Sequence, residues 1–409
     1  MNNVLYLIGS YPSDNAMTQH ELAIADLLVD LGYDVTFAVT RPDSIVREHE
    51  SWYEGYRFLS SSDLFFRSNK VFRYFERLTS RKSIHFCART ISELSPKIII
   101  AYGASYFLSA WLKEASVNSP WPVIVDETDW FQPRFRIGLA GSAILALDQR
   151  RIKTLDPFFD GVISISPFLY SFFKKHGSNT MFLPPINRRN EEFKPPLNSE
   201  RMDASDSIRL VYTGSLGGGK DLLEPVLEAI AEYYKRGGCS ISLTVAGVSE
   251  QEAANMWGEL AEHRAVKFLG RISHDESLDL VRQSDFGILL RRNELYARAG
   301  FSTKFSECMR NGVAMICNRV GGADTMLASW KDGVVLDKPC KEEIIQTFVK
   351  LEELGSSGIQ QMKTEAYKTA QSLFSRDMYR ESLEELINSA RNLKQRSNGY
   401  SEPSNEGGD

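Results

Sequence analysis

The stretch DFGILLRRNELYARAGFSTKFSECMRNGVAMICN, residues 285–318, holds two short apolar runs on either side of a helix-like segment. The runs at 285–290 and 314–318 are apolar on both faces, as in parallel strands that helices cover on both sides. A strand, a helix and a second strand in this order are typical of a parallel α/β sheet. The stretch therefore predicts one repeating unit of a doubly wound domain.

Similar strand-like runs alternate with helix-length segments along the whole chain. In the first half we predict strands at residues 4–9, 34–40, 97–103, 122–129 and 161–166. In the second half we predict strands at residues 208–214, 241–247, 266–270, 285–290, 314–318 and 333–337. The predicted fold class is α/β, with two Rossmann-like, doubly wound domains. Because ligands bind at the carboxyl ends of such strands, we expect the two domains to face each other across a cleft.

The domain boundary is marked by residues 183–207, which are rich in proline and charge and have no apolar period. A segment rich in proline and charge, without regularly spaced apolar residues, is typical of a linker. We therefore predict an N-terminal domain over 1–185, a linker over 186–207 and a C-terminal domain over 208–375. A last helix over 376–395 is expected to pack back on the N-terminal domain, and residues 396–409 are expected to be disordered.

The overall composition excludes several classes of protein. The chain has 409 residues and a formal net charge of −5, which argues against a nucleic-acid-binding protein. Its five cysteines are scattered and include no C-x-x-C pair, so we expect reduced thiols in the cytoplasm. No run approaches the ~20 apolar residues of a membrane span. We expect a cytoplasmic protein that is soluble or peripheral on the cytoplasmic face of the membrane.

Two corners between strand and helix in the second half suit phosphate groups. In the first, the glycine-rich loop SLGGGK at 215–220 precedes a helix, and Lys220 adds a positive charge. In the second, AGFSTKFSE at 299–307, the hydroxyl of Ser302 or Thr303 can cap the helix, while Glu307 can accept hydrogen bonds from a ribose diol. The alternatives are a flexible glycine turn and an ordinary cap with a solvated glutamate.

Residues 210–337 resemble the nucleotide-sugar-binding domain of GT-B glycosyltransferases, and glycosyltransferase family 4 in particular. The motifs that carry the resemblance are YTGSLGGGK, LTVAG, VKFLGRISHDE, SDFGILLRR, GFSTKFSECMRNGVAMICN and DGVVL, in this order. The first half resembles the acceptor domain more loosely, through VLYLIGSYPS, VIVDETDW and DGVISIS.

The resemblance implies roles for individual residues. Lys220 would bind the donor diphosphate, the amides of residues 300–303 would contact phosphate and sugar, and Glu307 would hold the ribose. The FLGR segment at 268–271 would line the nucleobase. The predicted donor-binding residues are Gly214, Ser215, Lys220, Arg271, Gly300, Phe301, Ser302, Thr303 and Glu307.

Three positions depart from the family pattern. Ala299 stands where the family has a glutamate that touches the donor sugar, and Ser215 stands where it has a phosphate-binding arginine. The N-terminal glycine pair of the family falls on Asn15 and Ala16. We hypothesise that arginines just before the second corner supply the missing charge. They are Arg291, Arg292 and Arg298.

The first half has an acidic group at a strand end. Among Asp126, Glu127 and Asp129, we predict that Asp129 is catalytic with Lys220, by orienting an acceptor hydroxyl or stabilising positive charge on the sugar. The alternative is that these acids only cap the next segment. No usual D-x-D metal site is present, and GT-B enzymes generally replace the metal with cations and helix dipoles, so we expect no metal. The histidines at 20 and 85 have no evident partner and are interpreted as ordinary.

Residues 64–89 form a basic segment with aromatic residues at helical spacing. Such a segment can lie on an anionic membrane surface, which would suit a lipid-linked acceptor. The alternative is a helix that packs on the core and exposes a basic face.

The resemblance as a whole implies transfer of a sugar, of hexosyltransferase type, with retention of configuration. The donor would be a UDP- or GDP-sugar, bound as substrate with no cofactor, and the acceptor a glycan or lipid-linked molecule in cell-surface polysaccharide or glycolipid assembly. Two alternatives remain open. Ala299 and Ser215 favour a non-catalytic partner subunit that binds a nucleotide sugar, and a related GT-B epimerase is the other.

Overall fold

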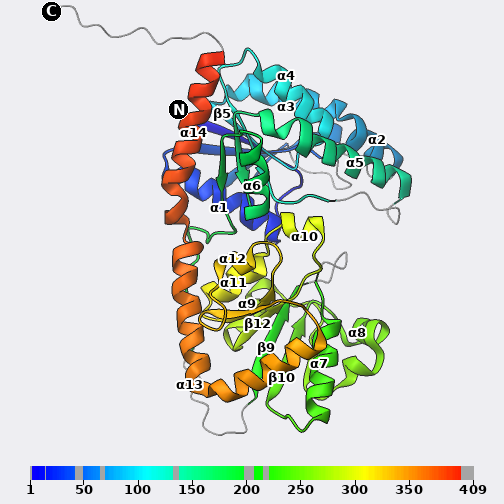
Figure 1. Cartoon of the computed structure of the whole chain (residues 1–409). Coiled ribbons are helices and arrows are strands. Elements are labelled where there is room, and N and C mark those ends of the chain that lie inside the picture. The colour runs from blue at the N-terminus through cyan, green and yellow to red at the C-terminus, as the bar shows by residue number, and fades with distance from the viewer. Residues whose placement is uncertain are drawn as a thin grey trace, which may run out of the picture. The chain divides into compact units, whose positions relative to one another are not determined.

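The computed structural model describes residues 2–13, 15–41, 49–64, 70–131, 138–197, 207–214 and 221–397. The chain divides into two compact units (Figure 1). Unit 1 contains Met1–Leu183 and Tyr379–Asp409, and unit 2 contains Pro184–Met378. Each unit is built on one largely parallel sheet, so the prediction of an α/β chain with two Rossmann-like domains is confirmed.

Unit 1 has an eight-stranded sheet in the order β3-β4-β2-β1-β5-β6-β7-β8. Its strands are β1 (Asn3–Ile8), β2 (Asp34–Val39), β3 (Glu50–Tyr53), β4 (Tyr56–Leu59), β5 (Ile98–Tyr102), β6 (Val123–Glu127), β7 (Gly161–Ser164) and β8 (Thr180–Phe182). All neighbours pair in parallel except β3 and β4, which pair antiparallel at one edge. β5 and β6 are buried along their whole length, as expected for central strands with helices on both faces.

Several helices surround this sheet, and α14 returns to it from the end of the chain (Figure 1). They are α1 (Ala16–Asp30), α2 (Lys70–Thr79), α3 (Arg81–Leu94), α4 (Tyr106–Ser116), α5 (Gly138–Thr154), α6 (Pro167–Lys175) and α14 (Arg380–Ser397). Asn15 begins α1 by accepting a hydrogen bond from the backbone amide of Thr18 at 3.0 Å. α14 packs against β7 and β8, and Asn179 Nδ2 donates to the carbonyl of Leu386 at 3.2 Å.

Unit 2 has a fully parallel sheet in the order β11-β10-β9-β12-β13-β14. Its strands are β9 (Ile208–Thr213), β10 (Ile241–Ala246), β11 (Val266–Phe268), β12 (Phe286–Leu289), β13 (Ala314–Asn318) and β14 (Gly333–Leu336). Its helices are α7 (Glu224–Lys235), α8 (Glu250–Trp257), α9 (His274–Arg282), α10 (Leu295–Ala299), α11 (Thr303–Arg310), α12 (Ala323–Met326) and α13 (Lys341–Leu373). The strand order reverses between β9 and β12, and ligands bind at such a switch point.

The described part of the predicted linker lies on unit 2. The backbone amide of Lys194 donates to the carbonyl of Arg310 at 2.9 Å, and Arg310 pairs with Glu191 at 2.6 Å. Residues 198–206 of the linker and 398–409 of the predicted tail lie outside the described residues. Among the described helices, none has the length and apolar character needed to cross a membrane.

Candidate active site

Three glycines meet at the carboxyl edge of the unit 2 sheet. Gly214, Gly247 and Gly270 follow β9, β10 and β11, with φ of 119°, 101° and 69°. The amide of Gly247 donates to the carbonyl of Gly270 at 2.6 Å, and a Cβ on Gly247 would lie 2.5 Å from the carbonyl oxygen of Gly214. Adjacent loops therefore touch backbone to backbone, which only glycine permits.

We expect Gly247→Ala to destabilise unit 2 by about 1–3 kcal/mol, because the new Cβ meets backbone atoms as well as an unfavourable φ. Gly237→Ala is the matched control, since Gly237 has φ of 93° but open space around the added Cβ. Thermal unfolding of the two variants separates the collision from the strain of φ. Equal losses in both would contradict the close backbone contact.

The side chain of Lys304 packs against Gly214. A Cβ on Gly214 would lie 2.5 Å from Lys304 Cε. Lys304 Nζ donates to Tyr212 Oη at 2.9 Å and to Asp221 Oδ2 at 2.6 Å, while Arg291 Nε donates to Asp221 Oδ1 at 3.0 Å. Burial opposes the charge of Asp221, but Lys304 and Arg291 outweigh it and hold the pKa of that carboxyl below its usual range. Two cations on one carboxylate leave a net positive charge at the switch point.

Arg291 is held in place by Asn318 at the end of β13. The amide of Arg291 donates to Asn318 Oδ1 at 2.8 Å, and Asn318 Nδ2 donates to the carbonyl of Arg291 at 2.9 Å. Arg292 and Arg298 are exposed. Of the three arginines that we considered for phosphate binding, Arg291 is the one that joins the Lys304–Asp221 cluster.

The start of α11 differs in one detail from expectation. Ser302 occupies the N-cap position and is buried, but its side chain makes no capping hydrogen bond. Of the two hydroxyls expected to cap the helix, that of Ser302 does not, although Ser302 lies at the N-cap position. Thr303 is the first residue of α11. The amides of the first turn are thus left without this side-chain partner.

Glu307 lies one turn further along α11 and is half-buried. Its carboxylate makes no hydrogen bond or ion pair with any described residue. Burial raises the pKa of Glu307, against the opposing effect of Arg310. A half-buried carboxylate that no described residue binds is available to a polar ligand.

The other predicted donor-binding residues have mixed positions. Gly300 lies directly after α10, and the ring of the partly buried Phe301 packs on Phe305 at 5.6 Å between centroids. Arg271 is exposed after β11. Ser215 and Lys220 lie outside the described residues, and their roles stay predictions.

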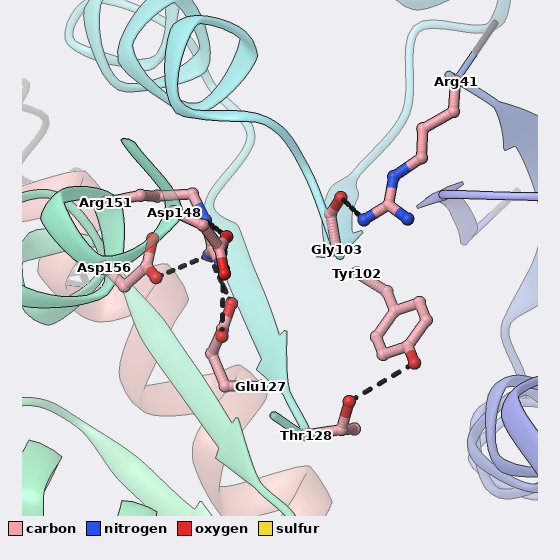
Figure 2. A network of polar contacts seen from close by, with 8 residues as sticks. All are labelled: Arg41, Tyr102, Gly103, Glu127, Thr128, Asp148, Arg151 and Asp156. Carbon is pink, nitrogen blue, oxygen red and sulfur yellow. Dashed lines mark hydrogen bonds and ion pairs between the residues drawn. The ribbon is translucent and has the colours of Figure 1, made fainter. Parts of the chain in front are cut away.

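A cavity of about 280 Å³ opens at the carboxyl edge of the unit 1 sheet. The strand ends contribute Gly9, Thr40, Arg41, Tyr102, Gly103 and the acidic segment 126–129, and α2, α4 and α5 form the other walls. Asp129, our predicted catalytic acid, lines this cavity, and its role there stays a prediction. Nearby, Thr128 Oγ1 donates to Tyr102 Oη at 3.3 Å (Figure 2).

Asp126 is fully engaged by protein groups. Tyr6 Oη donates to Asp126 Oδ2 at 2.6 Å, and His20 Nε2 lies 3.1 Å from both carboxyl oxygens. The interpretation of His20 as a residue without a partner was wrong. Its partner is 106 positions away in sequence, and no local pattern signals the pair.

Arg151 of α5 is surrounded by three carboxylates (Figure 2). Its guanidinium donates to both oxygens of Glu127, to Asp148 Oδ1 at 2.9 Å and to Asp156 Oδ2 at 2.5 Å. Glu127, Arg151 and Asp156 are each at most 3% exposed. Burial raises the pKa of Glu127 to about 8 and that of Asp156 to about 6, despite the opposing effect of Arg151. One guanidinium cannot compensate two buried carboxylates and the partly exposed Asp148 together, so the cluster holds a proton near neutral pH.

We expect the cluster to make unit 1 less stable as the pH rises. Between about pH 5 and about pH 8 the folded chain holds a proton on Glu127 that the unfolded chain has lost, so the free energy of unfolding falls by up to about 1.4 kcal/mol per pH unit. Glu127→Gln, which keeps the shape without the charge, should flatten this decline in thermal melts. The exposed Glu93→Gln serves as control, and a slope unchanged by Glu127→Gln would contradict the assignment.

α2 exposes aromatic side chains, whereas α3 packs on the core. Phe72, Tyr74 and Phe75 are 55%, 42% and 54% exposed, while Phe86 of α3 is buried. The alternative of a core-packed helix therefore holds for α3 and not for this face of α2. Residues 65–69 of the predicted basic segment lie outside the described residues.

Comparisons with known proteins agree with this architecture. Residues 207–353 match the family model described as glycosyl transferases group 1. Sucrose-phosphate synthase from Thermosynechococcus elongatus superposes with a TM-score of 0.68 at 12% identity, over 96% of this chain and 100% of that one. HepE from Anabaena, in complex with UDP and glucose, superposes with a TM-score of 0.63 at 14% identity, over 95% and 100%.

The chain has the GT-B fold. The resemblance to GT-B glycosyltransferases on which the sequence predictions rested is thus confirmed. A curated relative, an uncharacterised glycosyltransferase of Methanocaldococcus jannaschii, is 24% identical over 231 residues. This match covers 52% of the present chain and only 57% of the relative. Ala299, at the position where the resemblance implies a glutamate, is fully buried at the end of α10.

Proposed function

We propose that the chain is a glycosyltransferase that moves a sugar from a nucleotide diphosphate-sugar to an acceptor bound by unit 1. The observation that carries the proposal is the presence, at the switch point of unit 2, of both the Lys304–Arg291–Asp221 cluster and Glu307, whose carboxylate has no hydrogen bond or ion pair with the described residues. Positive charge suits a diphosphate, and a carboxylate one helical turn away suits a ribose diol. The UDP bound to HepE supports a UDP-sugar as donor.

The chemistry requires stabilisation of the diphosphate that leaves. The amides at the start of α11, the net charge of the cluster and Lys220 would supply it without a metal ion. Asp129 would orient the acceptor hydroxyl, and retention of configuration then needs no strong base. Metal independence, a hexose as the transferred sugar and retention are parts of this proposal that the family resemblance supports.

The acceptor is proposed to be a glycan or a lipid-linked molecule of the cell surface. The exposed aromatic residues of α2, together with the exposed Arg77, support contact with an anionic membrane. Liposome co-sedimentation that does not depend on anionic lipid would remove this part of the proposal.

A second candidate is a partner subunit that binds a nucleotide sugar without transferring it. The burial of Ala299 favours it, because no carboxylate at that position reaches the donor sugar. The two candidates differ in whether the nucleotide sugar is consumed.

The proposal is tested by incubating the protein with UDP- and GDP-sugars and a panel of glycan and lipid acceptors, while measuring release of nucleoside diphosphate. Arg291→Gln is expected to reduce release at least tenfold, because it removes one of two cations at the switch point. Arg292→Gln, exposed on the same loop, is the matched control. Donor binding without release would favour the partner subunit, and an altered sugar without release would favour the epimerase.

A further inference from the structure

The side chain of Arg41 packs against two glycines at the carboxyl edge of the unit 1 sheet. Its guanidinium crosses the ends of β1 and β5, where Gly9 and Gly103 leave space for it. A Cβ on Gly9 would lie 3.1 Å from Arg41 Cζ, and one on Gly103 would lie 2.9 Å from Arg41 Nη2. Nη2 also donates to the carbonyl of Gly103 at 2.7 Å (Figure 2). The two glycines thus hold a cation at the edge where doubly wound sheets bind ligands.

A second cation, Arg77 of α2, lines the same cavity and lies close enough to repel Arg41 electrostatically. Neither arginine forms an ion pair with a carboxylate within the part of the chain that the structure describes. Arg151, in contrast, is saturated by three carboxylates.

Four acids of the cavity wall, other than Asp129, bind protein groups outside the two arginines. Glu76 Oε1 accepts hydrogen bonds from the amides of Lys82 and Ser83, at 2.9 and 3.0 Å, and so caps α3. Asp126 is bound by Tyr6 and His20, and Glu127 and Asp148 are bound by Arg151. The cavity therefore has two like-charged guanidinium groups that form no direct ion pair with these four acids, and Arg41 interacts with Asp148 and with the buried Glu21 only at longer range.

Part of the cavity wall is apolar. Ile144, Leu145 and Leu147 of α5 face it together with Phe107 of α4 and Met17 of α1. A ligand that fills the cavity thus meets cations at one side and aliphatic or aromatic groups at the other.

We propose that Arg41 and Arg77 form a phosphate subsite, so that the acceptor of unit 1 is a phosphorylated molecule. A guanidinium binds phosphate through a planar fork of donors, and a second guanidinium nearby favours an anion over a neutral sugar. The phosphate can belong to a lipid or to a sugar, and the apolar wall suits the former. That this ligand is an acceptor rests on the proposed function, whereas phosphate binding itself does not.

The test is calorimetric titration of the full chain with four probes: glucose 6-phosphate, glucose, farnesyl phosphate and farnesol. We expect at least one phosphate probe to bind tenfold or more tightly than its neutral counterpart. Tighter binding of farnesyl phosphate would indicate a lipid as the source of the phosphate, and tighter binding of glucose 6-phosphate would indicate a sugar. Arg41→Gln and Arg77→Gln should each weaken that probe at least tenfold, and Arg41→Lys should weaken it less.

Arg89→Gln on α3 is the control, because Arg89 is exposed and lies outside the cavity. Thermal melts of each variant exclude unfolding as the cause of a loss. Equal binding of phosphate and neutral probes, absence of binding by both phosphate probes, or wild-type affinity in both glutamine variants would overturn the subsite. Donor hydrolysis without acceptor, measured on the same variants, reports on unit 2 alone, so failure of the proposed function is seen separately.

Discussion

Glu307→Ala is expected to lower kcat/KM for the nucleotide-sugar donor by about 100-fold, which corresponds to about 2.7 kcal/mol. The carboxylate has no partner among the described residues, so a ribose diol would supply its hydrogen bonds. Hydrogen bonds to a charged group contribute about 1.5–3 kcal/mol each. Glu307→Gln keeps one acceptor oxygen and should lose less, about tenfold.

The pH dependence of donor binding gives an independent check on Glu307. Because burial raises the pKa of this carboxyl, donor affinity should fall as the pH is lowered toward that pKa, and Glu307→Gln should abolish this dependence. Glu353→Ala, on the exposed face of α13, is the control for a general loss of charge. An unchanged kcat/KM in Glu307→Ala would show that the donor does not use this carboxylate.

Arg151→Ala is expected to destabilise unit 1 by about 3–5 kcal/mol at pH 8, because three carboxylates lose their shared cation. At pH 5 the loss should be smaller, since Glu127 and Asp156 then carry protons. Thermal melts at the two pH values measure the difference.

Arg89→Ala is the matched control for Arg151→Ala. Arg89 pairs with Glu93 at 3.7 Å on the surface, and such exposed pairs contribute about 0–1 kcal/mol. A loss in Arg151→Ala no larger than that of the control, or equal at both pH values, would contradict the buried cluster.

Much of the fold could be predicted from the sequence because central parallel strands are continuous apolar runs. All six strands of unit 2 were predicted in this way. β3, β4 and β8 were not: they are only three or four residues long, β3 and β8 lie at the sheet edges, and β4 lies next to β3. The side chains of β3 alternate between exposed and half-buried, so its sequence has no apolar run.

The part of the candidate site that could be predicted consists of residues that are close together in sequence. Glu307 and the start of α11 belong to a single strand–helix corner. The contacts of Lys304 with Asp221 and of Glu127 with Arg151 join residues 83 and 24 positions apart. The spacing of residues along the sequence does not predict such pairs, because it is the crossover connections of the sheet that bring them together. The direction of the Lys304 side chain is likewise not encoded locally, because it depends on the space that Gly214, 90 positions earlier, leaves by lacking a Cβ.

The most direct test of the proposed transfer is mass spectrometry of an acceptor panel incubated with UDP-sugars. The account predicts that one acceptor gains the mass of one sugar while an equal amount of UDP is released. It also predicts that Lys220→Ala and Glu307→Ala strongly reduce the gain and that Arg292→Gln preserves it. A nucleotide sugar that is bound and left intact in the presence of every acceptor would contradict the account.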